Sequence, residues 1–136
     1  LEGSIPVRDR PAAWVVMSGA DKLMAGSPGA YAQLSTRMSD VEESITKDIH
    51  RTFAVFEEVP GYSEVPEALV RGFRRTEKQK REALHRLLRA YANLDAEVSY
   101  HQGLNFIAAV ILLQVGDEES AFWTLVALLH LRHLRV

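Results

Sequence analysis

Residues 98–116 read VSYHQGLNFIAAVILLQVG, and the second half of this stretch is the most apolar run in the chain. A helix from Leu104 to Val115 would be apolar on every side. Gly116 is suited to end it, because glycine readily adopts the left-handed conformation found at helix C-termini. A helix that is apolar all round must be covered all round. The run therefore predicts a core helix inside a helical protein.

The residues that follow predict a second helix of the same kind. Asp117 is suited to cap its N-terminus, and Glu118 and Glu119 favour the positive end of its dipole. Its apolar residues point in nearly every direction: Phe122, Trp123, Leu125, Val126, Leu128, Leu129, Leu131 and Leu134. Because two such helices lie close to the end of the sequence, we expect their covering partners beyond Val136, in a larger all-helical domain.

Upstream of these two helices the periodicity is also helical. The apolar cluster Trp14–Met17 follows Pro11 and precedes Ser18-Gly19, which predicts a first short helix. The stretch AGSPGAY, residues 25–31, predicts a loop because it is rich in glycine, serine and proline.

A capping-box pattern marks the start of a further helix. Ser39 is followed three residues later by Glu42, and apolar residues then recur every four positions at Val41, Ile45 and Ile49. We therefore predict a helix over residues 40–50, with Arg51 projecting from its end.

The middle of the chain predicts two more helices. Pro60-Gly61 breaks the chain, and Pro66 suits the first turn of a helix that runs to about Phe73. A longer helix follows, with one apolar stripe formed by Leu84, Leu87, Leu88 and Tyr91. The fold class that we expect is all-α, an irregular multi-helix orthogonal array.

Composition excludes several classes of protein. Hydrophobic residues make up 47% and charged residues 25% of the 136 residues, which is typical of a globular protein and not of a disordered tail. The formal charge of −2 argues against a nucleic-acid binder. There is no cysteine, and hence no disulfide or thiolate metal site. The longest apolar run, residues 106–113, is far shorter than the roughly 20 residues that span a bilayer.

The sequence contains no clear motif for an active site that would work without a partner. No glycine is followed by the Lys-Ser/Thr of a phosphate-binding loop, and no His-Glu-x-x-His occurs. His130 and His133 have no third ligand nearby in sequence, so we expect no metal. The adjacent pair Glu57-Glu58 does not indicate a glycosidase-like site, which needs two carboxylates in different environments as acid and base. The basic segment 71–81 is interpreted as a solvated helix face in preference to a docking patch for an acidic partner or an anionic lipid.

Two short motifs remain, and spacing alone leaves the role of each open. Asp48 and Arg51 are three residues apart, which most often means a surface salt bridge of a few tenths of a kcal/mol. Ser99 and Gln102 also fit a capping box. Against capping, Gly103 would then occupy the start of the helix, where glycine costs up to about 1 kcal/mol unless a partner needs to approach closely. Capping and binding are therefore equally supported.

The ordered conjunction of three motifs is more specific than any one of them. The first pairs Ile-Pro with an arginine and a tryptophan, and is met by Ile5-Pro6, Arg10 and Trp14, followed by Ser18-Gly19. The second, Ile-x-x-Asp-x-x-Arg-Thr, is met by Ile45, Asp48, Arg51 and Thr52. The third, Tyr-x-Gln-Gly before a Leu-Asn pair, is met by Tyr100, Gln102, Gly103, Leu104 and Asn105. Together they resemble the TBC domain, the catalytic domain of GTPase-activating proteins for Rab-type small GTPases.

The resemblance covers nearly the whole chain. It implies that residues 5–136 are the N-terminal part of such a domain, in which Arg10 and Trp14 belong to a structural motif. Residues 1–4 look like a cloning remnant and are set aside. One departure is His101, where the family commonly has cysteine.

The resemblance also implies a mechanism with two fingers. Arg51 would be an arginine finger inserted into the nucleotide site of a bound GTPase. Gln102 would be a second finger that does in trans what the GTPase's own switch glutamine usually does. Asp48 would orient Arg51, Tyr100 and Asn105 would hold the glutamine-bearing turn with Thr52 in support, and Gly103 would let the nucleotide approach.

The implied partner is a Rab-family GTPase in its GTP-bound state. GTP and Mg²⁺ would belong to that partner, so we expect no cofactor and no independent small-molecule site in this chain. A cytoplasmic protein of vesicle trafficking is implied, recruited to endomembranes through its partner or other domains. Two alternatives stay open: a helical module that binds a Rab protein without catalysis, which the presence of both fingers disfavours, and an unrelated helical scaffold.

Overall fold

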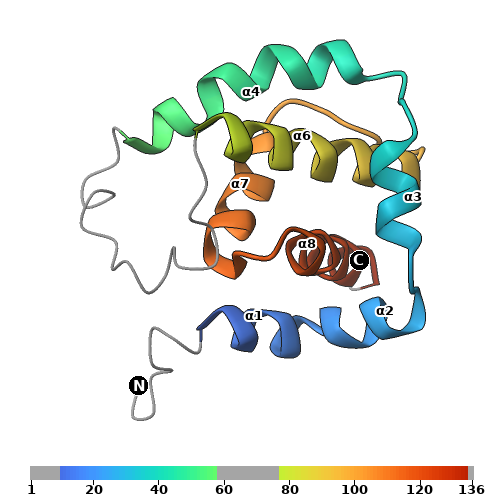
Figure 1. The fold of residues 1–136 in the computed structure, drawn as a ribbon. Helices are drawn as coiled ribbons and strands as arrows, with labels where there is room; N and C mark the ends of the chain where they lie inside the picture. Colours follow the sequence, from blue (N-terminus) through green and yellow to red (C-terminus); the bar gives the residue numbers. More distant parts are fainter. Residues whose placement is uncertain (1–9, 58–76, 135–136) are drawn as a thin grey trace.

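The computed structural model describes residues 10–57 and 77–134, and every regular element in those two ranges is a helix. The helices are α1 (Arg10–Ser18), α2 (Ala20–Gly26), α3 (Ala30–Thr36), α4 (Glu42–Glu57), α6 (Glu77–Leu94), α7 (Leu104–Val115) and α8 (Glu118–Leu134). Figure 1 shows α8 nearly end-on while α1, α4 and α6 run across the view, so the helices cross steeply. The all-α prediction is confirmed. The helix predicted over 66–73, the break at Pro60-Gly61 and most of the basic segment 71–81 lie outside the described residues.

The two apolar helices form the centre of the molecule, as their sequences predict. α7 ends at Val115, and Gly116 follows with φ 88°. Asp117 caps α8, because its Oδ2 accepts a hydrogen bond from the Ser120 N–H at 2.9 Å. α8 packs against α1, α2, α6 and α7, and its residues from Ala121 to Ala127 are buried. α7 therefore ends, and α8 begins, where the capping residues indicate.

The stretch predicted as a loop, AGSPGAY, contains less loop than expected. Only residues 27–29 leave the helical conformation, and they join α2 to α3. Each of these helices has seven residues and buries few side chains, among them Ala20 and Tyr31. Seven residues give too few turns for an apolar period to stand out, so the glycine and proline content outweighed it.

Helix α4 differs from its prediction at both ends. It starts at Glu42 instead of Asp40 and continues to Glu57 instead of His50. The Glu42 carboxylate accepts hydrogen bonds from both the N–H (3.3 Å) and the hydroxyl (2.7 Å) of Ser39, so the capping box is only half formed. Arg51 consequently lies within the body of the helix and not at its end.

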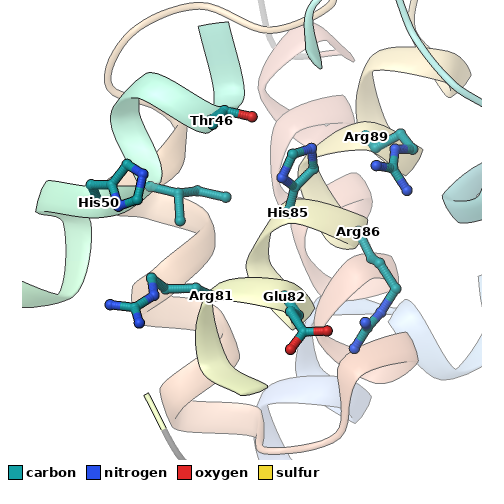
Figure 2. Close-up of a pocket in the computed structure, with 8 residues that line it drawn as sticks. Thr46, His50, Arg81, Glu82, His85, Arg86 and Arg89 are labelled. Carbon is teal, nitrogen blue, oxygen red and sulfur yellow. The ribbon is translucent and has the colours of Figure 1, made fainter. Parts of the chain in front are cut away.

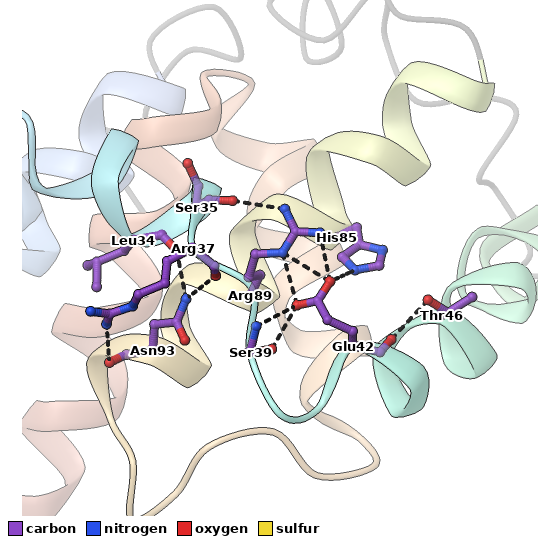
Figure 3. Close-up of polar contacts among 9 residues, drawn as sticks. All are labelled: Leu34, Ser35, Arg37, Ser39, Glu42, Thr46, His85, Arg89 and Asn93. Atoms are coloured by element: carbon purple, nitrogen blue, oxygen red, sulfur yellow. Dashed lines mark hydrogen bonds and ion pairs between the residues drawn. The ribbon is translucent and has the colours of Figure 1, made fainter.

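A polar cluster centred on Glu42 ties the start of α4 to α6 (Figure 3). The Arg89 guanidinium donates to both Glu42 oxygens at 2.7–3.0 Å and to the Ser35 carbonyl at 2.9 Å. His85 Nε2 lies 2.8 Å from Glu42 Oε1. Next to it, the Asn93 amide donates to the carbonyls of Leu34 and Arg37. The connection between α3 and α4 is thereby held on α6, whose predicted apolar stripe is fully buried.

Several apolar side chains stay exposed. On α7 these are Ile107 and Val110, and on α1 they are Trp14, Val16 and Met17. No helix in the described ranges is long and apolar enough to span a bilayer.

Candidate functional site

Both predicted fingers line one pocket of about 210 Å³. Asp48 and Arg51 reach it from α4, Gln102 from the turn before α7, and Asn105 and Phe106 from the first turn of α7. The structure therefore brings together residues from two motifs that lie far apart in the sequence.

Helix α4 holds Arg51 by burying the opposite face. Ile49, Thr52 and Phe53 are buried, whereas Arg51 is exposed. In the described part of the chain no ion pair joins Arg51 to Asp48, so the surface salt bridge indicated by their spacing is absent. The Asp48 carboxylate instead accepts a hydrogen bond from the Tyr100 hydroxyl. The orientation of Arg51 is thus set by its helix and not by a direct bond to Asp48.

The turn that carries Gln102 lies outside α7. The helix begins at Leu104, and Gly103 immediately precedes it with φ 105°. His101 and Gln102 are exposed, and Ser99 has φ 52°. The capping box proposed for Ser99 and Gln102 is therefore not formed. A Cβ added at Gly103 would meet no described atom within 4 Å, so its positive φ, and not crowding within the chain, is what requires glycine here.

A chain of hydrogen bonds through two buried side chains ties this turn to α4. The Thr52 hydroxyl donates to the Asp48 carbonyl at 2.7 Å and accepts from the Asn105 amide at 2.9 Å. The side-chain oxygen Oδ1 of Asn105 accepts from the Gly103 N–H at 3.1 Å. Thr52 is 0% and Asn105 2% exposed, so the bond between these two side chains is shielded from water.

The Tyr100–Asp48 bond forms a second tie between the same two elements. Burial raises the pKa of Tyr100, and the hydrogen bond to Asp48 raises it further. The phenol therefore stays protonated and keeps donating at any physiological pH. With the Thr52–Asn105 bond, it fixes the backbone of the Gln102 turn relative to the helix that carries Arg51.

A larger pocket of about 400 Å³ lies between α4 and α6 (Figure 2). Its lining includes His50, Arg81, His85, Arg86 and Arg89. Most of these basic side chains are already paired with carboxylates. Arg89 and His85 contact Glu42, and Arg86 forms an ion pair with Glu118 through two hydrogen bonds of 2.8–2.9 Å. This pocket contains neither finger.

The sequence that forms this pocket matches a known family model. The Rab-GTPase-TBC domain model matches residues 8–135, nearly the whole chain. The chain belongs to this family.

Curated relatives of this TBC chain support the same assignment. Growth hormone-regulated TBC protein 1-A of Danio rerio is 38% identical over 128 residues, covering 92% of this chain and 32% of that protein. Growth hormone-regulated TBC protein 1 of Homo sapiens is 34% identical over 126 residues, covering 91% and 34%. Rab GTPase-activating protein tbc-11 of Caenorhabditis elegans is 31% identical over 132 residues, covering 95% and 12%. The chain spans about a third or less of the length of these relatives.

One lining residue of this TBC site, Phe106, was not among the predicted site residues. The sequence carries no signal for this role, because Phe106 reaches the pocket through its place in the first turn of α7, next to the Gln102 turn. Arg10 is the first residue of α1, and Trp14 on the same helix is 38% exposed; neither is among the five residues that line the pocket.

Proposed function

We propose that this TBC chain accelerates GTP hydrolysis by a Rab-family GTPase, with Arg51 and Gln102 acting in trans on the nucleotide. The observation that supports this most is that both side chains line one pocket and are exposed there. In the described part of the chain, no side chain is paired with the Arg51 guanidinium. It is therefore available to a ligand that a partner supplies.

The two side chains suit the chemistry of phosphoryl transfer. The barrier falls when a water molecule is positioned and when charge on the phosphoryl oxygens is stabilised, so the activating protein needs to supply no covalent intermediate. The guanidinium of Arg51 is planar, always charged and rich in donors, which suits the phosphoryl oxygens. The carboxamide of Gln102 is donor and acceptor at once, which suits a water.

The hydrogen bonds between α4 and the turn support joint action. Groups that are already fixed lose little freedom when the transition state forms, so they stabilise charge more effectively than mobile groups. In this proposal three residues hold the turn in place and do not take part in the reaction: Thr52, Tyr100 and Asn105. The C. elegans relative carries the name Rab GTPase-activating protein, which agrees with this function.

The remaining features of the proposal concern the partner. The Rab protein would bind in its GTP-bound state and bring its own nucleotide and Mg²⁺. The chain would act in the cytoplasm on vesicle-trafficking membranes, reached through the partner or through other domains.

The test is single-turnover GTP hydrolysis by a panel of purified Rab proteins, with and without the purified protein. We expect Arg51→Ala to reduce the stimulated rate at least about a hundredfold, since an arginine finger contributes 10³ to 10⁵ in rate. Arg51→Lys should also be strongly impaired, because a lysine lacks the planar fork. Lys22→Ala, which removes an exposed charge on α2, serves as the control and should leave the rate unchanged. Undiminished stimulation in the Arg51→Ala variant contradicts the proposal, and complex formation without acceleration favours a non-catalytic binding module.

A further inference from the structure

The side chain of Asp95 helps to hold the segment between α6 and the Gln102 turn. This residue follows Leu94, the last residue of α6. Its Oδ2 accepts a hydrogen bond from the Tyr91 hydroxyl at 3.1 Å, and its Oδ1 accepts from the Val98 N–H at 3.2 Å. The carboxylate thus bridges a fully buried residue of α6 and the backbone just before the turn.

The backbone at this point adopts a conformation that needs such support. Ser99 is the one residue other than glycine in the described ranges with a positive φ, 52°. Residues with a Cβ disfavour this region. The Ser99 N–H donates to the Asp95 carbonyl at 2.6 Å, so the main chain of Asp95 holds Ser99 while its side chain holds Val98. Both contacts act on the residues that lead directly into Tyr100 and Gln102.

Electrostatics at Asp95 favour the bridging role. Burial raises the pKa of its carboxyl group, but the hydrogen bonds from Val98, Tyr91 and the Glu97 backbone, together with the nearby His130, lower it, and the net pKa lies below its ordinary value. The side chain is therefore ionised at neutral pH, when it accepts both bonds. It does not line the finger pocket.

We infer that Asp95 is a positioning residue for Gln102, fixing the entry to the turn from the α6 side as Asp48 and Thr52 fix it from the α4 side. This inference rests on the proposed function. It implies that loss of the Asp95 carboxylate misplaces the Gln102 carboxamide without removing any group that touches the nucleotide.

The test is a double-mutant cycle between Asp95 and Gln102 in the single-turnover hydrolysis assay. Asp95→Ala should reduce the maximal stimulated rate at least about tenfold, while the half-saturating protein concentration changes less than about threefold. In a Gln102→Ala background the same substitution should lower the rate less than about twofold, because the group that it positions is already gone. Asp95→Asn is the matched control and should keep at least about a third of the rate, since an amide can accept from Val98 and donate to the Tyr91 oxygen.

Two results overturn the inference. One is an Asp95→Ala rate within about twofold of the unmodified protein, and the other is an equal loss in both backgrounds, which indicates a general structural effect. If the Asp95→Ala protein has lost its helical circular dichroism at the assay temperature, the Tyr91→Phe variant is tested in its place. This substitution removes the hydroxyl that donates to Asp95 and keeps the buried ring. A loss of at least about threefold that vanishes in the Gln102→Ala background supports the inference, and no loss contradicts it.

The assay separates this inference from the proposed function. If neither Arg51→Ala nor Gln102→Ala changes stimulated hydrolysis, the proposed function fails. If both abolish it while Asp95→Ala has no effect, only the role of Asp95 fails.

Discussion

Asn105 shows at the residue scale how one buried amide holds the candidate site. It donates to the Thr52 hydroxyl and accepts from the Gly103 N–H, and it is almost completely buried. Removing the amide deprives the Gly103 N–H of this acceptor and leaves the Thr52 hydroxyl with only its bond to the Asp48 carbonyl, and each lost bond at a buried polar side chain costs about 1–3 kcal/mol.

We therefore predict that Asn105→Ala lowers the free energy of unfolding by about 2–4 kcal/mol, measured by urea denaturation. The same substitution at Gln114, a partly exposed residue of α7, should change stability by less than about 1 kcal/mol and serves as the control. Equal effects at the two positions would contradict the role given to the buried bonds.

Gly103 permits a second prediction at the same scale. Its φ of 105° is costly for any residue with a Cβ, although an added Cβ would meet no described atom within 4 Å. Gly103→Ala should therefore lower the free energy of unfolding by about 1–3 kcal/mol through backbone strain alone. Gly26→Ala, at a position with equally open space and no positive φ, is the matched control and should be neutral or slightly stabilising. A neutral result at Gly103, measured by thermal unfolding, would show that the turn relaxes.

At the residue scale, the sequence motifs indicated the candidate finger residues and their supporting residues, but not the hydrogen bonds that join them. Arg51 and Gln102 were predicted through their motifs, and the structure places them at one pocket. Their motifs alone could not show that Asp48 is bonded to Tyr100, because a carboxylate three residues before an arginine is equally compatible with a local ion pair. Which bond forms depends on how α4 packs against the turn. Because the two residues are far apart in the sequence, no local sequence pattern indicates this contact.

At the scale of elements, α4 is positioned by its ion pair with α6. The hydrogen bonds from Arg89, followed by those from Ser39 and His85, lower the pKa of Glu42 from 4.5 to about 2 against the opposing effect of burial. Because the folded-state pKa lies below the unfolded value, Glu42 contributes stability at pH values above about 4.5, and this contribution is lost as the pH falls towards 2.

Glu42→Gln should remove this contribution. We predict a loss of about 1–3 kcal/mol in unfolding free energy at pH 7 and a flatter dependence of stability on pH between 4.5 and 2. Glu43→Gln, an exposed neighbour on the same helix, is the control. Urea unfolding across this pH range gives both values, and a Glu42→Gln protein with an unchanged pH profile would contradict the link between α4 and α6.

The elements also differ in how well the sequence predicts them. α7 and α8 were predicted, with the glycine that ends α7 and the aspartate that caps α8, because long apolar runs and strong capping residues agree there. α2 and α3 were missed because each is seven residues long. The end of α4 was placed too early because Arg51 and Thr52 interrupt the apolar period, whereas Thr52 is buried as a hydrogen-bonded partner of Asn105.

At the scale of the whole molecule, apolar side chains on α1 and α7 remain open to solvent. Met17 is 78% and Val16 62% exposed on α1, and Ile107 and Val110 are exposed on α7. Exposed apolar residues that gather on one surface favour association with another surface.

We therefore predict that the 136-residue chain self-associates at micromolar concentration. Light scattering after size exclusion should give a mass above that of a monomer, and Val110→Glu should shift the mass towards the monomer. The same change at Ala32, an exposed residue of α3, is the control and should leave the mass unchanged. A monodisperse monomer at all concentrations would show that these residues do not drive association.

The central claim is that Arg51 and Gln102 act together on a nucleotide held by another protein. It is tested most directly by the affinity for a responsive Rab protein loaded with GDP and aluminium fluoride, a mimic of the transferring phosphoryl group, compared with GDP alone. The account predicts at least about a hundredfold tighter binding to the mimic, and loss of that preference in both Arg51→Ala and Gln102→Ala, since catalytic groups bind the transition state more tightly than the ground state. Equal affinity for the two forms, or a preference that survives both substitutions, would contradict it.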